Sequence, residues 1–102
     1  MAWFVKTETF TAETAALSIE QRRPFLEAHR HWLDQHIGLG RRIRSGFLVD
    51  DQRRPGGGGM LIFQASSYAD ALDWVSQDPM IVEGLVAWQL QEWIPVSGDD
   101  WP

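Results

Sequence analysis

The sequence contains no cysteine, which excludes disulfides, thiolate metal sites and cysteine nucleophiles. No apolar run approaches the length of about eighteen residues that a membrane-spanning helix needs, so we expect no contact with a membrane. The first residues, Met1 to Lys6, lack the basic start and the long apolar stretch of a signal peptide. Together these absences favour a cytoplasmic protein.

Basic residues are missing from the second half of the chain. All nine Lys and Arg residues lie at or before Arg54, and eight of the nine are Arg. The net charge of −5 argues against a nucleic-acid partner, because such binding depends mainly on neutralising phosphates. The stretch from Arg41 to Arg54 could bind a small carboxylate or phosphate through paired hydrogen bonds, or it could be a solvated strand edge and loop.

The sequence is instead rich in apolar and aromatic residues. Hydrophobic residues make up 44% of its 102 positions, and six residues are Trp, which is enough apolar surface for one ordered core. So many Trp side chains in a small domain also indicate an interface or a pocket. We expect one domain over residues 1–96, followed by a C-terminal tail over residues 97–102.

Helical signals are clearest in the first half of the chain. Ser18 and Gln21 match a capping box, and apolar residues then recur at helical spacing until Gly38. Pro24 is unfavourable inside a helix, so we expect either a kink or a fresh helix start there.

The remaining segments complete the order β-α-β-β-α-β. They are a strand near residues 3–7, a half-exposed strand at 41–49, a flexible connection at 50–59, a strand buried on both faces at 60–63, a helix capped by Ser66 and Ser67, a short turn beginning at Asp78, and a strand at 86–96. This order predicts an α+β, ferredoxin-like fold with both helices on one face of a four-stranded antiparallel sheet. The other face would be apolar and bare. We therefore expect a homodimer that covers this open face, the alternative being a monomer with an apolar sheet surface.

Two apparent motifs carry no cofactor chemistry. The four glycines at positions 56–59 lack the Lys-Ser/Thr of a phosphate-binding loop and join two strands. His29, His31 and His36 contain no pair four residues apart, and His29 and His36 lie about 10 Å apart along a helix. We therefore expect neither a metal nor an organic cofactor.

His29 is the most informative polar residue. It lies in the apolar arc of the predicted helix, so its ring points toward the sheet. It is either a hydrogen-bonded core residue or, beside a carboxylate, a group that transfers protons near neutral pH. Asp78 is the best carboxylate partner, although its position before Pro79 is equally that of a simple helix cap.

Three short motifs, in this order and spacing, resemble the YCII-related family over nearly the whole chain. They are AHRHWL at residues 28–33, SGFL at 45–48 and DPM at 78–80 followed by Gly84. The resemblance implies a dimeric α+β barrel and an active site centred on His29 and Asp78. It also implies proton transfer with elimination or isomerisation of small, often aromatic-derived molecules. Phe47 and Met80 depart from the usual family pattern, which bears on the substrate more than on the fold.

Our first hypothesis is an enzyme that needs no cofactor. His29 would act as general base and then acid, while Asp78 orients it. Trp32, His36 and Phe47 are predicted pocket residues, and Arg42 or Arg44 a predicted anchor for an anionic ligand. The alternatives are a non-catalytic domain that binds a small molecule in the same pocket, and a purely structural His29–Asp78 pair.

Overall fold

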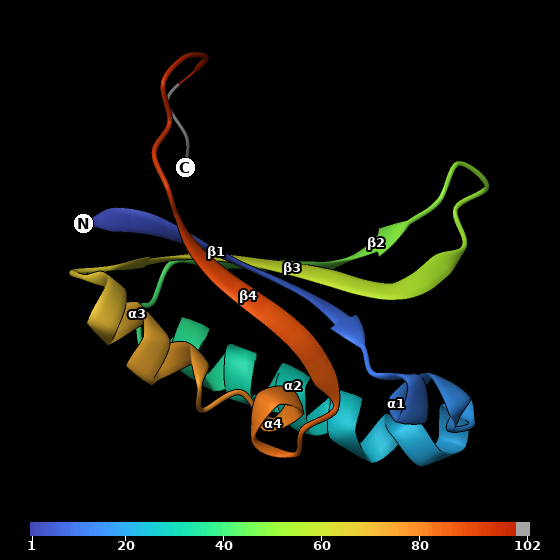
Figure 1. The fold of residues 1–102 in the computed structure, drawn as a ribbon. Coiled ribbons are helices and arrows are strands. Elements are labelled where there is room, and N and C mark those ends of the chain that lie inside the picture. The colour runs from blue at the N-terminus through green and yellow to red at the C-terminus, as the bar shows by residue number, and fades with distance from the viewer. Residues whose placement is uncertain (100–102) are drawn as a thin grey trace.

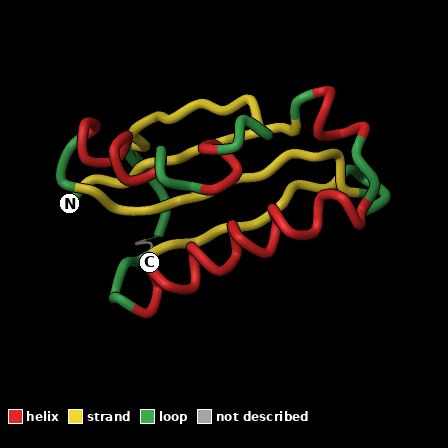
Figure 2. Tube along the Cα trace, turned by 90° about the horizontal axis from the view of Figure 1, so that it is seen from below, coloured by secondary structure: helices red, strands yellow, loops and turns green. Residues whose placement is uncertain are grey.

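The computed structural model describes residues 1–99 and has an α+β fold (Figure 1). The four strands are β1 (Ala2–Phe10), β2 (Ile43–Val49), β3 (Pro55–Ala65) and β4 (Val86–Trp93), and they form one antiparallel sheet in the order β2-β3-β1-β4. The helices are α1 (Ala12–Ala16), α2 (Ile19–Gly38), α3 (Tyr68–Val75) and α4 (Pro79–Val82). All of them lie on one side of the sheet (Figures 1 and 2). The predicted ferredoxin-like arrangement is confirmed. Within residues 1–99, no helix is both long and apolar enough to cross a membrane.

Helix α2 begins where the capping box predicts. Ser18 accepts a hydrogen bond from the backbone of Gln21, and the Gln21 side chain accepts one from the backbone of Ser18. The helix then continues without a break through Pro24, so the alternative of a fresh start at this residue is wrong. Pro24 is exposed, and water can therefore satisfy the carbonyl that a proline cannot bond.

The glycine run is the main departure from the predicted fold. The flexible connection expected at residues 50–59 is a short turn, in which Asp50 accepts hydrogen bonds from the backbones of Gln52 and Arg54. Residues 56–59 instead belong to β3, where Gly59 pairs with Glu8 of β1. Gly57 has a φ of +79°, and a Cβ there would lie 3.0 Å from the Phe10 ring. Glycine is thus required by close packing in a strand rather than by loop flexibility.

The core lies between the sheet and the helices. It contains Phe4, Leu61, Phe63 and Leu90 from the strands and Trp32, Leu33, Ala71, Trp74 and Val75 from α2 and α3. Trp32 and Trp74 stack with their ring centroids 4.7 Å apart. Helix α2 buries only part of its apolar arc, since Leu26 and Ile37 are 41% and 49% exposed. This incomplete burial leaves space beneath the helix.

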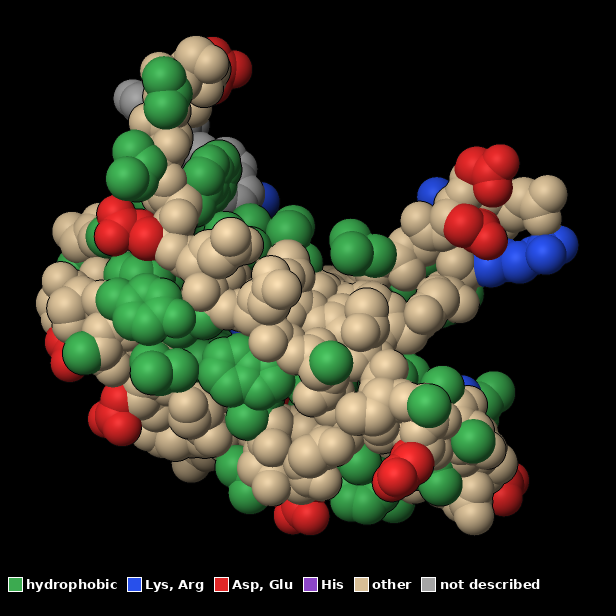
Figure 3. Space-filling model, viewed as in Figure 1, with side chains coloured by type: hydrophobic (Ala, Val, Ile, Leu, Met, Phe, Trp, Pro, Cys, Tyr) green, Lys and Arg blue, Asp and Glu red, His purple; other side chains and the backbone are tan. Residues whose placement is uncertain are grey.

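The opposite face of the sheet carries no helix. Met60 of β3 and Trp93 of β4 point to this face and are partly exposed. Hydrophobic groups are visible between the C-terminal segment and the β2–β3 hairpin (Figure 3). Strand β4 ends at Trp93 rather than Val96, because Pro95 lacks the N–H that would continue the ladder. The predicted tail at residues 97–102 is described only as far as Asp99, and residues 100–102 lie outside the described part.

Candidate functional site

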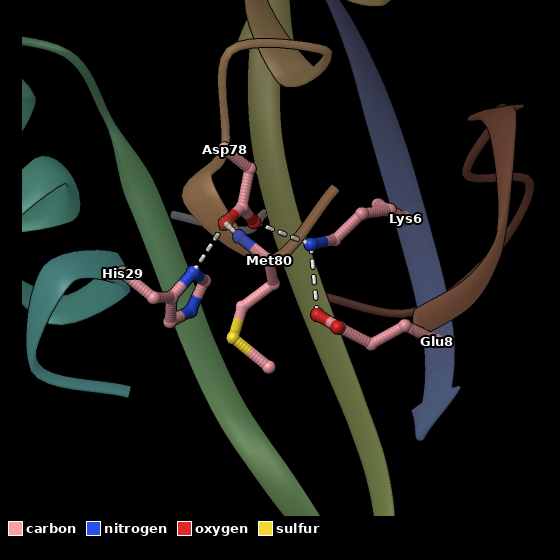
Figure 4. Close-up of polar contacts among 5 residues, drawn as sticks. All are labelled: Lys6, Glu8, His29, Asp78 and Met80. Carbon is pink, nitrogen blue, oxygen red and sulfur yellow. Dashed lines mark hydrogen bonds and ion pairs between the residues drawn. The ribbon is translucent and has the colours of Figure 1, made fainter. Parts of the chain in front are cut away.

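His29 and Asp78 are in direct contact. His29 projects from the middle of α2, and its Nδ1 lies 2.8 Å from Oδ1 of Asp78 (Figure 4). Asp78 precedes α4, and the same oxygen also accepts a hydrogen bond of 3.0 Å from the backbone N–H of Met80. Asp78 therefore caps helix α4 and also contacts the imidazole of His29 through the same oxygen. Since a carboxylate accepts, the proton of a neutral His29 is on Nδ1, and Nε2 is left as the basic nitrogen.

Lys6 completes the contacts of Asp78. Its ammonium group is fully buried, donates a hydrogen bond of 2.8 Å to Oδ2 of Asp78 and forms an ion pair of 2.8 Å with Oε1 of Glu8. Neither Lys6 nor Glu8 was among the site residues predicted from the sequence. A signal was present, because the only lysine of the chain occupies the same face of β1 as the core residue Phe4, two residues away.

The charges around Asp78 keep it ionised. Burial raises the pKa of this carboxyl, but the hydrogen bond from His29 and the positive charge of Lys6 lower it by more. The net result is a pKa below the ordinary value for aspartic acid. Asp78 is therefore a carboxylate at neutral pH, able to orient His29 and to stabilise its protonated form.

This lowered pKa predicts an acid-dependent loss of stability. A carboxyl whose pKa falls on folding stabilises the protein fully above its unfolded value of about 3.9, and the contribution is lost as pH falls through the folded value. We expect the difference in unfolding free energy between wild type and Asp78→Asn to be constant above about pH 5 and to shrink below about pH 4. Urea titrations across this range measure it, and the exposed Asp73→Asn is the control. A difference that does not change with pH would contradict the assignment.

A cavity of about 1160 Å³ opens beside this cluster. It lies between α2 and the end of the sheet formed by β2 and β3, and both His29 and Glu8 are on its wall. Most of the remaining wall is apolar, with Arg22, Arg30 and Arg44 among its charged members. The apolar contributors are Phe10, Ile19, Leu26, Leu33, Ile37, Ile43, Phe47, Pro55 and Met80. Within residues 1–99, no group of three His, Asp or Glu side chains is arranged to hold a metal ion.

The predicted pocket residues fall into two groups. Phe47 and Arg44 line the cavity together with His29. Trp32 and His36 do not: Trp32 stacks in the core, and His36 accepts a hydrogen bond of 3.2 Å from the indole of Trp74.

Trp32 and His36 miss the cavity because of the direction in which they leave helix α2. The apolar arc that the sequence predicts spans two directions: Leu26 and Ile37 face the cavity, whereas Trp32 and His36 face α3. Arg42 is also outside this cavity, with its guanidinium 6.0 Å from the ring centre of Trp3. Of the two predicted anion anchors, only Arg44 is among the residues that line the cavity, and its pairing with Ile62 directs its side chain to the opposite face of β2 from Phe47.

The chain is similar to known proteins both in sequence and in fold. The model of one protein family, described as the YCII-related domain, matches residues 3–94. No curated protein matches the sequence. Among solved structures, the fold is similar to that of 5-chloro-2-hydroxyhydroquinone dehydrochlorinase from Burkholderia phenoliruptrix AC1100, in complex with 2,5-dihydroxybenzoquinone. The TM-score is 0.67 at 21% identity, over 90% of this chain and 93% of the other. The two proteins share a fold.

Proposed function

Because the chain belongs to the YCII-related family, we propose that it is a small-molecule enzyme in which His29 transfers protons and Asp78 orients it. The observation that carries the proposal is the contact of 2.8 Å between His29 Nδ1 and Asp78 on the wall of a cavity. This contact holds the imidazole in the tautomer that leaves Nε2 basic. The side chain of His29 is 18% exposed, so a ligand in the cavity can reach it.

The reaction that fits this arrangement is an elimination or an isomerisation. His29 Nε2 takes a proton from the substrate, and the electron pair of the broken bond forms a new double bond. In an elimination, a leaving group departs from the neighbouring atom with the electron pair of its broken bond, and His29 then gives its proton to that group. In an isomerisation, the existing double bond shifts and His29 returns the proton at a different carbon. Neither reaction requires a metal, an organic cofactor or an oxidant.

The substrate class we propose is a small hydroxylated ring compound or carboxylate. The cavity wall is mostly apolar, which suits a ring, and Arg22 and Arg30 of α2 on the same wall are the proposed anchors for an anionic group. The dehydrochlorinase of similar fold is named for a chlorinated hydroxyhydroquinone, which supports the same class. We also propose that the uncovered face of the sheet packs against a second protomer, and a mass measurement in solution decides this.

A non-catalytic binding or accessory domain is the alternative function. The same cavity supports it, because an apolar pocket with a few polar groups binds a ligand whether or not chemistry follows.

Thermal unfolding in the presence of small hydroquinones, dihydroxybenzoquinone, hydroxybenzoates and dicarboxylates separates these functions. A true ligand at a hundred times its dissociation constant adds about 2.7 kcal/mol to the unfolding free energy, which raises the midpoint by several degrees. Each stabilising compound is then incubated with the protein in D₂O and followed by NMR. We expect at least one to be consumed or to gain deuterium. Stabilising compounds that all remain unchanged would favour the binding domain instead.

A further inference from the structure

Glu8 presents an unused hydrogen-bond acceptor at the cavity. Its side chain is 12% exposed and its Oε1 is bound to Lys6 at 2.8 Å. For the other oxygen, Oε2, the structure of residues 1–99 contains no hydrogen bond or ion pair. Glu8 lies on the cavity wall that also carries His29. A ligand beside the imidazole would therefore meet a carboxylate that has a free oxygen.

Lys6 occupies one of the two carboxylate oxygens of Glu8. An ammonium group only donates hydrogen bonds, and Lys6 is fully buried between Asp78 and Glu8. With His29 neutral, the charges of these four side chains, one positive and two negative, sum to −1. The cavity wall at Glu8 consequently accepts hydrogen bonds and repels anions.

A glycine of β3 lies beside Glu8 in the sheet. Gly59 pairs with Glu8 across β3 and β1, so the two residues share a face of the sheet. A Cβ at Gly59 would lie 3.5 Å from Cγ of Glu8 and 3.7 Å from its Oε1. A side chain at position 59 would therefore start in van der Waals contact with the Glu8 side chain. The glycine run thus contributes directly to the shape of the site.

From this geometry we propose that Glu8 is a ligand-binding residue that accepts a hydrogen bond from a hydroxyl group on the bound molecule. The cavity would then select neutral hydroxylated rings over ring ethers and over ligands with a carboxylate at this position. The inference rests on the proposed function in that it assigns a specificity role within the same cavity. It concerns binding only, so it can fail or hold independently of turnover.

Two probe molecules of similar ring size test this role. Hydroquinone carries hydroxyl donors, which stay protonated at pH 7 because phenols titrate near pH 10, whereas 1,4-dimethoxybenzene only accepts. One hydrogen bond to a charged group corresponds to roughly a ten- to hundredfold preference of wild type for hydroquinone. Calorimetric or NMR titration at neutral pH measures the two dissociation constants.

The variant Glu8→Gln should abolish or reverse the preference. The amide oxygen must face Lys6, because Lys6 donates, and the amide NH₂ is then turned toward the cavity as a donor. Glu92→Gln makes the same change in charge on the same face of the sheet but outside the cavity, and should leave the preference intact.

Three results would overturn the role of Glu8. They are equal affinity of wild type for the two probes, binding of neither probe by wild type, or an unchanged preference in a folded Glu8→Gln. The first two need no variant, so poor folding of Glu8→Gln does not weaken the test. A wild-type preference for hydroquinone without turnover of any ligand would instead contradict catalysis and leave the Glu8 subsite standing.

Discussion

Replacing His29 by asparagine is expected to lower turnover of a substrate of this cavity by roughly 10²- to 10⁴-fold, the usual contribution of a general acid–base group. Asparagine places an amide N–H close to the position of Nδ1, so the hydrogen bond to Asp78 can persist. The amide does not take up a proton near neutral pH, and the proton-transfer step is therefore lost. Steady-state kinetics with a compound identified by the ligand panel measure the effect.

His31→Asn is the matched control for this variant. His31 lies two residues further along α2, is exposed and does not line the cavity. Asparagine at either position carries the same modest helix penalty, so a difference between the two variants reports the role of the site rather than of the helix. If His29→Asn turned over substrate as fast as wild type, proton transfer by His29 would be disproved. If it lost stability but no activity, the purely structural pair would be favoured.

Replacing Asp78 by alanine is expected to destabilise the protein by about 3–5 kcal/mol, the usual result of removing one partner of a buried ion pair. The change removes acceptors for His29, for Lys6 and for the backbone of Met80. Lys6 would remain fully buried with Glu8 as its one ion-pair partner among the described residues. A loss of this size is a large share of the stability of a typical domain, and urea unfolding measures it.

Ser67→Ala separates the ion cluster from the helix cap. Ser67 caps α3 through the backbone N–H of Asp70, much as Asp78 caps α4, but it takes no part in the ion cluster. Losing a cap alone costs about 1 kcal/mol. Equal losses for Asp78→Ala and Ser67→Ala would show that the buried charges add nothing. The double variant Lys6→Met/Asp78→Leu should lose less unfolding free energy than the sum of the losses in Lys6→Met alone and in Asp78→Leu alone. The reason is that each single variant leaves one charge of the pair without its partner, whereas the double variant removes both.

The order of the elements could be predicted because it depends on local signals, whereas the family was identified from the resemblance of three short motifs. The capping box at Ser18, the N-cap of Asp78 before Pro79 and the alternation along the strands act over a few residues. The position of His29 within the apolar arc of α2 follows from helical periodicity in the same way. Each of these features can be read without knowing how the elements pack.

The wall of the cavity could not be predicted in the same manner. Periodicity shows that Trp32, His36 and Leu26 belong to one arc, but whether each meets the core or the cavity depends on how α2 is rotated against its neighbours. The glycines at 56–59 suggest flexibility, and only pairing with β1 makes them part of a strand. Strand alternation places Lys6 and Glu8 on the same face of β1 as Phe4, but only the packing of the helices on the sheet shows that Lys6 is fully buried and paired with Asp78.

The sequence by itself determined the antiparallel α+β fold and the inward direction of His29, because apolar periodicity and helix caps are properties of neighbouring residues. Only the tertiary structure decided that Asp78, 49 residues away, meets His29, and that Lys6 holds Asp78 and Glu8 together beside a cavity. The physical reason is that these contacts join β1, α2 and the start of α4. Their distances are set by how the helices pack on the sheet, and no local pattern encodes that packing.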